Sequence, residues 1–183
     1  MITIRPEEPR DIEAILRVNA LAFGREEEPD IVRALRRSGK VLCSMVAEAQ
    51  DEIVGHILFS PMTIESGEVA HNAVCLGPLA VLPNFQRQGV GSQLMEAGLA
   101  ECRRQGHKAV FLLGHPSYYP RFGFRPAREF DVHYQDDRDA FMAVELVQGA
   151  LQRISGRAVF AEKCNNVFET MLNYASQSVK WAA

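Results

Sequence analysis

The stretch Leu79-AVLPNFQRQGVGSQ-Leu94 predicts a buried strand, a tight turn and the start of a helix. It continues the most apolar run of the chain, Val74–Leu82. Gly89 and Gly91 let the backbone approach a ligand closely, and a helix that begins here presents unpaired N–H groups with partial positive charge. This arrangement predicts an anion site suited to a phosphate or pyrophosphate, with Arg87 as an added cation. The competing interpretation is a strand–helix corner that needs glycine only for close packing.

Two familiar phosphate-binding motifs do not fit this stretch. A Walker-type loop requires Gly-Lys-Ser/Thr, whereas Ser92-Gln93 follows the second glycine. A dinucleotide-binding fingerprint requires a third glycine where Leu94 stands, and a shorter gap between the strand and the first glycine. Both motifs are therefore excluded.

Composition sets the frame around this motif. The chain has 183 residues, 47% of them hydrophobic, which is the size of one domain, and its net charge of −3 argues against bulk nucleic-acid binding. Its four cysteines lie far apart and form no Cys-x-x-Cys pair, so we expect no metal site and no disulfide framework. No signal peptide and no apolar run of the ~20 residues that span a bilayer are evident. We therefore expect a cytoplasmic protein with no membrane contact.

Strand and helix patterns alternate along the chain, which predicts a mixed α/β fold. Gly77-Pro78 interrupts the central strand and indicates locally broken pairing, because proline cannot donate to a ladder. Pro29 is expected to lie between the first two helices. Gln50-Asp51-Glu52 predicts a hairpin turn between the second and third strands, and the third strand is expected to continue through Pro61. The predicted strands are Ile2–Arg5, Val41–Ala47, Ile53–Ser60, Val74–Leu82, Ala109–Leu113, Phe124–Phe130 and Phe141–Leu146, and the predicted helices follow Asp11, begin at Asp30, and run from Val90 to Gly106.

The pattern Leu-Ala-Val-x-Pro-x-x-Gln-x-x-Gly-x-Gly resembles the acetyl-CoA-binding signature of the GNAT N-acetyltransferase superfamily. A second match is Tyr118-Tyr-Pro-Arg-Phe-Gly-Phe124, in which Tyr119 stands five residues before the Phe of a Gly-Phe pair, as in family members. This version is most similar to the YhbS-like branch. The resemblance covers residues 1–146, and residues 147–183 are expected to be an extension that packs on the same domain. Within this extension a helix is predicted at Val167–Tyr174.

The resemblance implies a GNAT-like three-layer fold, with a mostly antiparallel sheet that is splayed between its fourth and fifth strands and flanked by helices. Acetyl-CoA is expected to lie in the opening as the cosubstrate. Backbone groups of the strand would pair with its pantetheine arm, and the following turn would hold its pyrophosphate. The expected cofactor-binding residues are Leu79, Ala80, Val81, Gln86, Arg87, Gln88, Gly89, Val90, Gly91 and Ser92. Many relatives carry an asparagine before the tyrosine, whereas this chain has Gly114-His-Pro-Ser there, so asparagine contacts are not expected.

The implied reaction transfers an acetyl group to a primary amine by direct attack in a ternary complex. Tyr119 is the expected general acid, because a tyrosine pKa of about 10 lies only about 1.5 units above that of a cysteine-like thiol. Tyr118 is a weaker candidate. The general base stays open between His115 and a water chain, with Glu65, Glu68 and His71 in a loop as weaker candidates, and His56 is expected to be a core histidine.

The acceptor is either a small molecule or a protein amine. Glu26–Glu28 could attract a cationic amine, although a solvated charge run is the simpler interpretation. The alternative functions are a non-catalytic CoA-binding sensor or interaction module, a structural domain without a nucleotide ligand, and transfer of an acyl group larger than acetyl. Homodimers are common in the family, and the sequence leaves the oligomeric state open.

Overall fold

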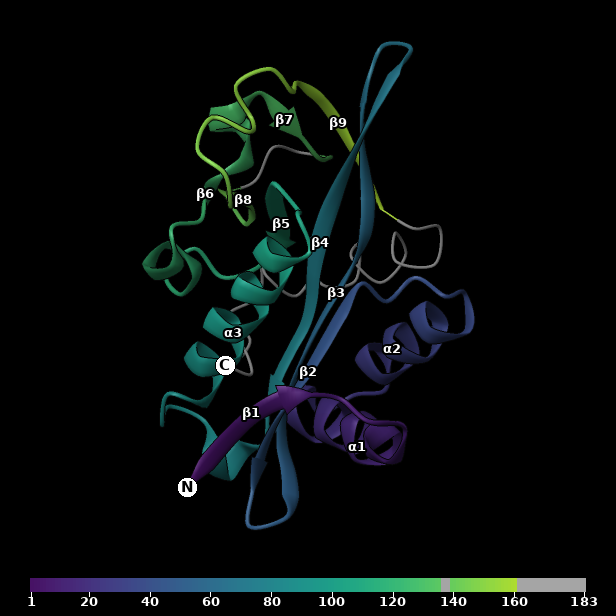
Figure 1. Cartoon of the computed structure of the whole chain (residues 1–183), viewed down its shortest axis with the longest axis vertical. Helices are drawn as coiled ribbons and strands as arrows, with labels where there is room; N and C mark the ends of the chain where they lie inside the picture. The colour runs from purple at the N-terminus through teal and green to yellow at the C-terminus, as the bar shows by residue number, and fades with distance from the viewer. Residues whose placement is uncertain (136–138, 161–183) are drawn as a thin grey trace. The chain divides into compact units, whose positions relative to one another are not determined.

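A computed structural model describes residues 1–135 and 139–160 of the chain, which form a mixed α/β fold with a mostly antiparallel sheet (Figure 1). The chain divides into two compact units: Met1–Ser60 with Gly77–Glu101, and Pro61–Leu76 with the described residues from Cys102 onward. The helices are α1 (Ile12–Phe23), α2 (Glu27–Arg37) and α3 (Val90–Arg104). The strands are β1 (Ile2–Pro6), β2 (Cys43–Ala49), β3 (Glu52–Ser66), β4 (Val69–Val81), β5 (Ala109–Leu113), β6 (Arg125–Pro126), β7 (Val132–His133), β8 (Phe141–Glu145) and β9 (Gly156–Phe160).

The first unit contains strands in the order β1-β2-β3-β4. β1 pairs with β2, and β2 with β3, in antiparallel register. The β2–β3 turn places Gln50 and Asp51 at φ of 50° and 63°, values that match the right-handed twist of a tight hairpin. The predicted hairpin is therefore confirmed, and β3 extends through Pro61 as expected.

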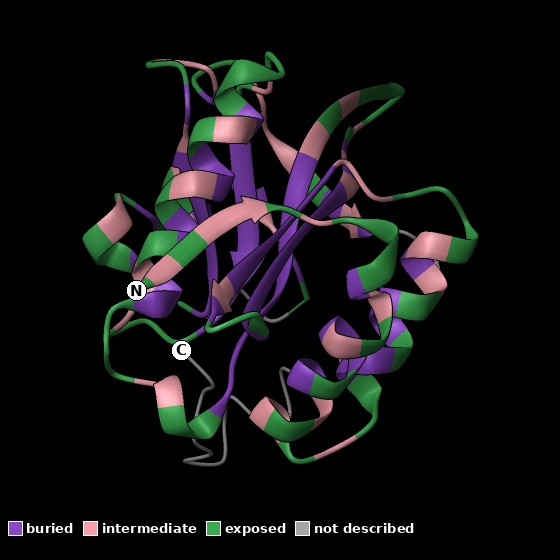
Figure 2. Cartoon of the chain, turned by 60° about the horizontal axis from the view of Figure 1, so that its bottom comes forward, coloured by how far each residue is buried: buried purple, intermediate pink, exposed green. Residues whose placement is uncertain are grey.

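Alternation along β3 places helices on both faces of this part of the sheet. A Cβ added at Gly98 of α3 would lie 2.4 Å from Phe59, and one added at Gly55 would lie 2.9 Å from Leu94 of α3. The intervening His56 points to the other face, where Asn19 of α1 contacts it. Glycines at these two positions thus let α3 pack closely on β3. In Figure 2 the central strands are largely buried, β1 has no buried residue, and each helix has an exposed face.

The second unit is built around β5. This strand pairs in parallel with Val74–Leu76 of β4 and in antiparallel with the whole of β8. Strand β9 pairs with β3 from Met62 to Glu65, and its Phe160 contacts the ring of Tyr134 at a centroid distance of 4.8 Å. Residues 156–160 are therefore part of the sheet. The helix predicted at Val167–Tyr174 lies outside the described residues.

Two expected loop boundaries are wrong. Helix α2 begins at Glu27 and holds Pro29 in its first turn, where proline is tolerated because its missing N–H has no helical partner. Gly24 alone ends α1, in the left-handed conformation at φ 71°. Likewise, Glu65 belongs to β3 and His71 to β4, so the expected loop is a long hairpin with Glu68 at its turn.

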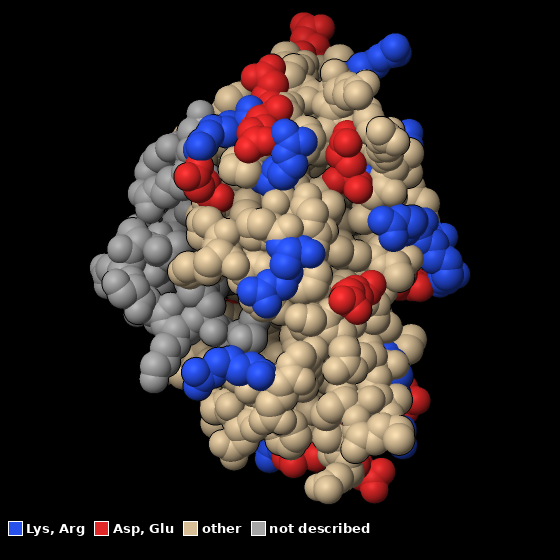
Figure 3. Space-filling view, turned by 90° about the vertical axis from the view of Figure 1, so that its left-hand side faces the viewer, with Lys and Arg blue, Asp and Glu red and all other residues tan. Residues whose placement is uncertain are grey.

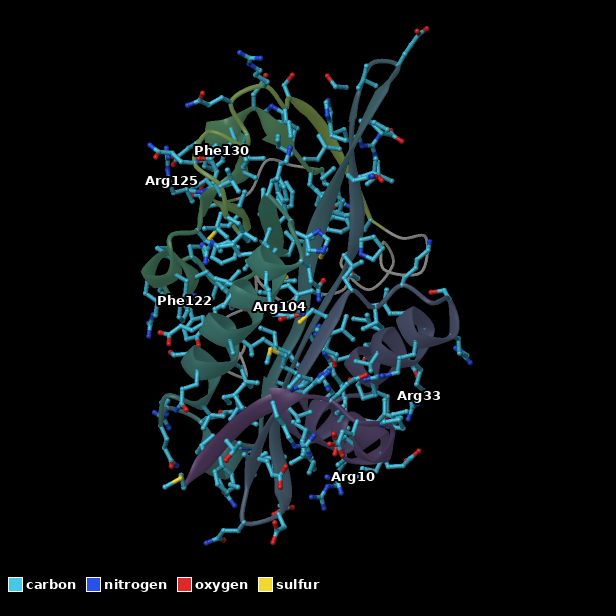
Figure 4. All side chains as sticks on the ribbon, in the orientation of Figure 1. Arg10, Arg33, Arg104, Phe122, Arg125 and Phe130 are labelled. Carbon is cyan, nitrogen blue, oxygen red and sulfur yellow. The ribbon has the colours of Figure 1, made fainter. Side chains whose placement is uncertain are left out.

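The strand predicted at Phe124–Phe130 is also wrong. Only Arg125 and Pro126 pair with β8, and a 3₁₀ turn follows. Pro126 has no N–H to extend the ladder. Arg125 closes a local turn instead, because its guanidinium lies 5.0 Å from the ring of Phe130 and donates to Glu129 (Figure 4).

Among the described residues, Cys43, Cys75 and Cys102 are buried, and Cys164 lies outside them. In the same part of the chain, no helix is long and apolar enough to cross a membrane.

Candidate functional site

At the end of β4 the side chains are buried, so only the backbone can contact a ligand. Leu79 is 5% exposed, and Ala80 and Val81 are fully buried. The parallel ladder with β5 ends at Leu76, whereas β4 continues to Val81. The strand end is held on β3, because Leu82 N–H donates to the carbonyl of Val54 at 2.9 Å. Only main-chain groups of this segment are therefore suited to contact a ligand.

Two glutamine side chains brace the turn that follows β4. Gln86 donates from Nε2 to the carbonyl of Val81 at 2.9 Å, and Gln88 donates from Nε2 to the carbonyl of Asn84 at 2.8 Å. Both side chains are thus committed to holding the turn in shape. If they contact a ligand from this conformation, they must do so through their backbone or their remaining polar atoms.

The turn adopts the geometry of an anion cradle. Arg87 and Gly89 have φ of 58° and 85°, and α3 begins at Val90. Gln93 N–H closes the first helical turn on the carbonyl of Gly89 at 3.0 Å. The N–H groups of the first turn of a helix lack intrahelical acceptors, and left-handed residues next to them turn further N–H groups to the same side. Arg87 and Gly89 are exposed, so this cradle is open to solvent.

Tyr119, in the second unit, is the first residue of a 3₁₀ helix that spans Tyr119–Phe122. Its side chain packs on Gly114, where an added Cβ would lie 2.1 Å from its Cε2 atom, and edge-on against Phe124 at a centroid distance of 5.9 Å. Burial, and to a lesser degree the neighbouring Tyr118, raise the pKa of Tyr119 above its usual value. Its hydroxyl forms no hydrogen bond with another of the described residues.

The sequence analysis did not predict that Gly114 leaves room for the ring of Tyr119. Gly114 follows the last residue of β5, and its N–H donates to the carbonyl of Ala140 at 2.9 Å. A glycine at the end of a buried strand, shortly before a tyrosine, was the available signal.

The neighbours of Tyr119 lie in more exposed positions. The ring of Tyr118 is stacked by the guanidinium of Arg121 at 4.6 Å and lies 5.5 Å from the ring of Phe122, a packing arrangement. His115 is exposed, and its Nδ1 lies 2.7 Å from the hydroxyl of Ser117.

His56 is a core histidine, as predicted. Asn19 Nδ2 donates to the carbonyl of Ile15 at 2.8 Å and to His56 Nδ1 at 3.0 Å. His56 Nε2 therefore carries the proton and donates to Ser44 Oγ at 3.0 Å, and Ser44 donates to Glu7. Burial lowers the pKa of His56 to about 3, so the ring is neutral in the folded protein.

The acidic run at the start of α2 is not uniformly solvated. Glu26 and Glu27 are exposed, but Glu28 is fully buried, with Arg25 donating from Nε to its two oxygens at 3.0 and 2.9 Å. The expectation of a solvated charge run is wrong at Glu28, because its carboxylate is sequestered by an arginine on the preceding turn.

The predicted cofactor-binding residues all belong to one compact unit, whereas the predicted general acid, Tyr119, belongs to the other. Leu79–Ser92 all belong to the first unit, and Tyr119 and His115 belong to the second. Within residues 1–135 and 139–160, no group of three or more His, Cys, Asp or Glu side chains is arranged to hold a metal ion.

Comparisons with known proteins place the chain in a family. The model of the acetyltransferase (GNAT) domain matches residues 3–127. The chain is 30% identical over 165 residues to the uncharacterized N-acetyltransferase YhbS of Escherichia coli K12, a match that covers 88% of this chain and 98% of YhbS. It is 39% identical over 118 residues to YjhQ of the same organism, another uncharacterized N-acetyltransferase, but that match spans only 63% of this chain and 65% of YjhQ.

Solved structures agree. Escherichia coli YhbS in complex with CoA matches with a TM-score of 0.84 and 30% identity, over 90% of this chain and 92% of that one. A GNAT family acetyltransferase from Brucella melitensis in complex with acetyl-CoA matches with a TM-score of 0.75 and 31% identity, over 90% of this chain and 98% of that one. The chain therefore belongs to the GNAT acetyltransferase family.

Proposed function

We propose that this protein is an N-acetyltransferase that transfers the acetyl group of acetyl-CoA to a primary amine by direct attack in a ternary complex. The observation that carries the proposal is the open cradle of N–H groups at Arg87–Ser92, at the start of α3, in a chain of the GNAT family. The solved relatives in complex with CoA and acetyl-CoA support the choice of cosubstrate.

The proposed cosubstrate contacts divide between strand and turn. Main-chain groups of Leu79 and Val81 pair with the pantetheine amides, and the compact side chain of Ala80 stays in the core. The pyrophosphate binds to N–H groups from Arg87 to Ser92, with the Arg87 guanidinium as a mobile cation. Gln86 holds the turn closed through its bond to Val81.

In the proposed reaction, the neutral amine attacks the thioester carbonyl carbon, the C–N bond forms, and the C–S bond then breaks. The leaving thiolate takes a proton from the hydroxyl of Tyr119. The raised pKa of Tyr119 keeps this hydroxyl protonated. Proton transfer from Tyr119 to the thiolate is therefore less favourable than transfer from a tyrosine with an ordinary pKa would be. The proton that the amine loses goes to His115 or to a chain of water molecules.

The test is acetyl transfer by the purified protein to a broad panel of primary amines, including peptides. In Tyr119→Phe, kcat should fall about 100-fold or more with an unchanged Kd for acetyl-CoA, because only proton donation is lost. Tyr118→Phe is the matched control and should keep most activity. If acetyl-CoA binds but no amine is acetylated, the protein is a CoA-binding sensor or interaction module, and the enzymatic proposal fails.

The proposal extends to the class of acceptor, the acyl group, the cellular compartment and the oligomeric state. The acceptor is a small molecule or a protein amine, and propionyl-CoA in the same assay tests whether a larger acyl group is preferred. We place the protein in the cytoplasm, a compartment that suits widely spaced cysteines with no Cys-x-x-Cys pair. A homodimer, common in this family, is tested by light scattering of the purified protein.

A further inference from the structure

The second unit contains a cavity that involves neither the proposed acetyl-CoA residues nor Tyr119. Its volume is about 390 Å³, in the range of small-molecule sites. It is lined by the end of β3, the start of β4, the turn between α3 and β5, strand β5 itself, and residues 150–154. Its apolar floor includes Ile64 and Phe111, which are fully buried, and its polar rim is formed by His71, Asn72, His107 and Lys108.

The wall between α3 and β5 is fixed by backbone hydrogen bonds. Gly106, at φ 84°, donates to the carbonyl of Arg103, and His107 N–H donates to the carbonyl of Cys102, both at 3.0 Å, which is the pattern of a Schellman cap. The carbonyl of Lys108 accepts from the N–H groups of Leu146 and Val147 at 2.8 and 3.2 Å. The backbone that carries two of the rim residues is therefore preorganised.

The wall formed by residues 150–154 is fixed by the carboxylate of Glu145, which accepts two backbone hydrogen bonds. Glu145 accepts from the N–H groups of Gly149 at 3.1 Å and Leu151 at 2.7 Å, which fixes the segment that lines the cavity. Glu145 is not part of the lining, and no Asp or Glu among the described residues is. Within the described residues, Lys108 forms no ion pair. The rim thus combines one uncompensated cation with imidazole and amide groups.

We propose that this cavity binds a small organic carboxylate with a compact apolar body. The ammonium of Lys108 and the polar groups of His71, Asn72 and His107 provide charge-assisted and neutral hydrogen bonds for one anionic head group. The apolar floor accepts a hydrocarbon body, which gains from leaving water. An amine ligand does not suit the site, because the rim offers a cation and no carboxylate. The cavity is thus a second ligand site, separate from the proposed acetyl-CoA residues and from Tyr119.

Calorimetric titration with octanoate, and with octanamide as the uncharged analogue of equal size, tests this proposal on the full chain. Octanoate should bind at one site and about tenfold or more tighter than octanamide, as expected for a charge-assisted contact. Lys108→Gln should remove most of that preference. Lys40→Gln is the matched control, since Lys40 is an exposed lysine of the first unit and should leave binding unchanged. Ala150→Phe, which fills the cavity, should abolish octanoate binding while thermal melting shows that the variant stays folded.

The proposal is overturned if octanoate does not bind, if octanamide binds equally well, or if Lys108→Gln binds octanoate as the parent does. It is also overturned if acetyl-CoA competes with octanoate, because the carboxylate would then occupy the cosubstrate site. Retained octanoate binding in a folded Ala150→Phe variant would likewise contradict it.

Discussion

The ring of Tyr119 lies where it does because Gly114 has no side chain. A Cβ at Gly114 would lie 2.1 and 2.7 Å from two ring atoms of Tyr119, closer than any van der Waals contact allows. The N–H of Gly114 donates a hydrogen bond to the carbonyl of Ala140, which fixes the backbone at this position. The ring of Tyr119 must therefore move to make room for the added methyl group. We expect Gly114→Ala to lower kcat about tenfold or more while acetyl-CoA still binds, because a small displacement of a proton donor is costly.

A double variant separates this effect from general damage to the fold. Once Tyr119→Phe has removed the hydroxyl, displacing the ring has no proton transfer left to disturb. Gly114→Ala combined with Tyr119→Phe should therefore turn over at nearly the rate of Tyr119→Phe alone. Fully additive losses would contradict the assignment of Gly114 as the residue that positions the tyrosine.

His56 gives the protein a predictable sensitivity to mild acid. Its pKa is lowered to about 3 by burial in the folded protein, whereas an unfolded histidine titrates near 6.5. Between these values the unfolded state binds the extra proton, so stability is full above about pH 6.5 and falls by up to about 1.4 kcal/mol per pH unit below it. Urea denaturation at pH 7, 6 and 5 measures this slope before most carboxylates titrate.

The matched variant for this measurement is His56→Gln, which keeps polar atoms near Asn19 and Ser44 but cannot titrate. It should be less stable than the parent at pH 7, and its free energy of unfolding should change less between pH 7 and 5. Equal slopes in the two proteins would show that another group controls the acid response.

At the scale of single residues, sequence reasoning identified what local pattern determines and missed what packing determines. His56 alternates with apolar residues on a strand, so its burial followed from period alone. Glu28 stands in a run of three glutamates that has every local mark of a solvated surface. Its burial depends on the packing of α1 against α2 and on Arg25, neither of which a local charge pattern reveals.

At the scale of elements, close approach of α3 to β3 positions the start of the cradle helix. An added Cβ at Gly98 would lie 2.4 and 2.6 Å from two atoms of the fully buried ring of Phe59. Alanine in a helix gains about 1 kcal/mol over glycine, but overpacking a core costs about 1–3 kcal/mol. We therefore expect Gly98→Ala to destabilise the protein by about 1 kcal/mol in chemical denaturation.

A second substitution tests the origin of that loss. Phe59→Leu removes the ring atoms that the new methyl group would meet, so the double variant should be less destabilised than the sum of the two single changes. If Gly98→Ala is instead more stable than the parent, the helix and strand do not approach as closely as described.

Elements with strong local signals were predictable, and those without them were not. The hairpin at Gln50-Asp51 and the buried strand Ala109–Leu113 follow from turn residues and apolar runs. The segment Phe124–Phe130 has strand-forming residues, but Pro126 and the contact of Arg125 with Phe130 fold it into a turn. Strand β9 was missed because its pairing with β3 joins residues far apart in the sequence.

At the scale of the whole molecule, charge does not mark the site. The net charge is −3, and Lys and Arg are interspersed with Asp and Glu on the face that Figure 3 shows. A polyanionic cosubstrate is therefore proposed to be held mainly by backbone N–H groups of the turn before α3, a geometry that composition could not reveal. The motif around Gly89 and Gly91 carried this information, because it reports local backbone conformation.

This mode of binding predicts a weak dependence on salt. Proteins that bind polyanions through many side-chain cations lose about 10³-fold or more in affinity between 50 and 200 mM salt. Here Arg87 is the one cation assigned to the cradle, so we expect the Kd for acetyl-CoA to rise only about threefold over that range. Arg87→Gln should weaken binding about fivefold at low salt and flatten the remaining dependence, since fixed dipoles are not displaced by ions as a mobile guanidinium is. Calorimetric titrations of both proteins at the two salt concentrations measure this, with Lys40→Gln as the control for loss of one distant charge. A hundredfold loss of affinity in the parent would show that side-chain cations, and not the backbone of the cradle, hold the cosubstrate.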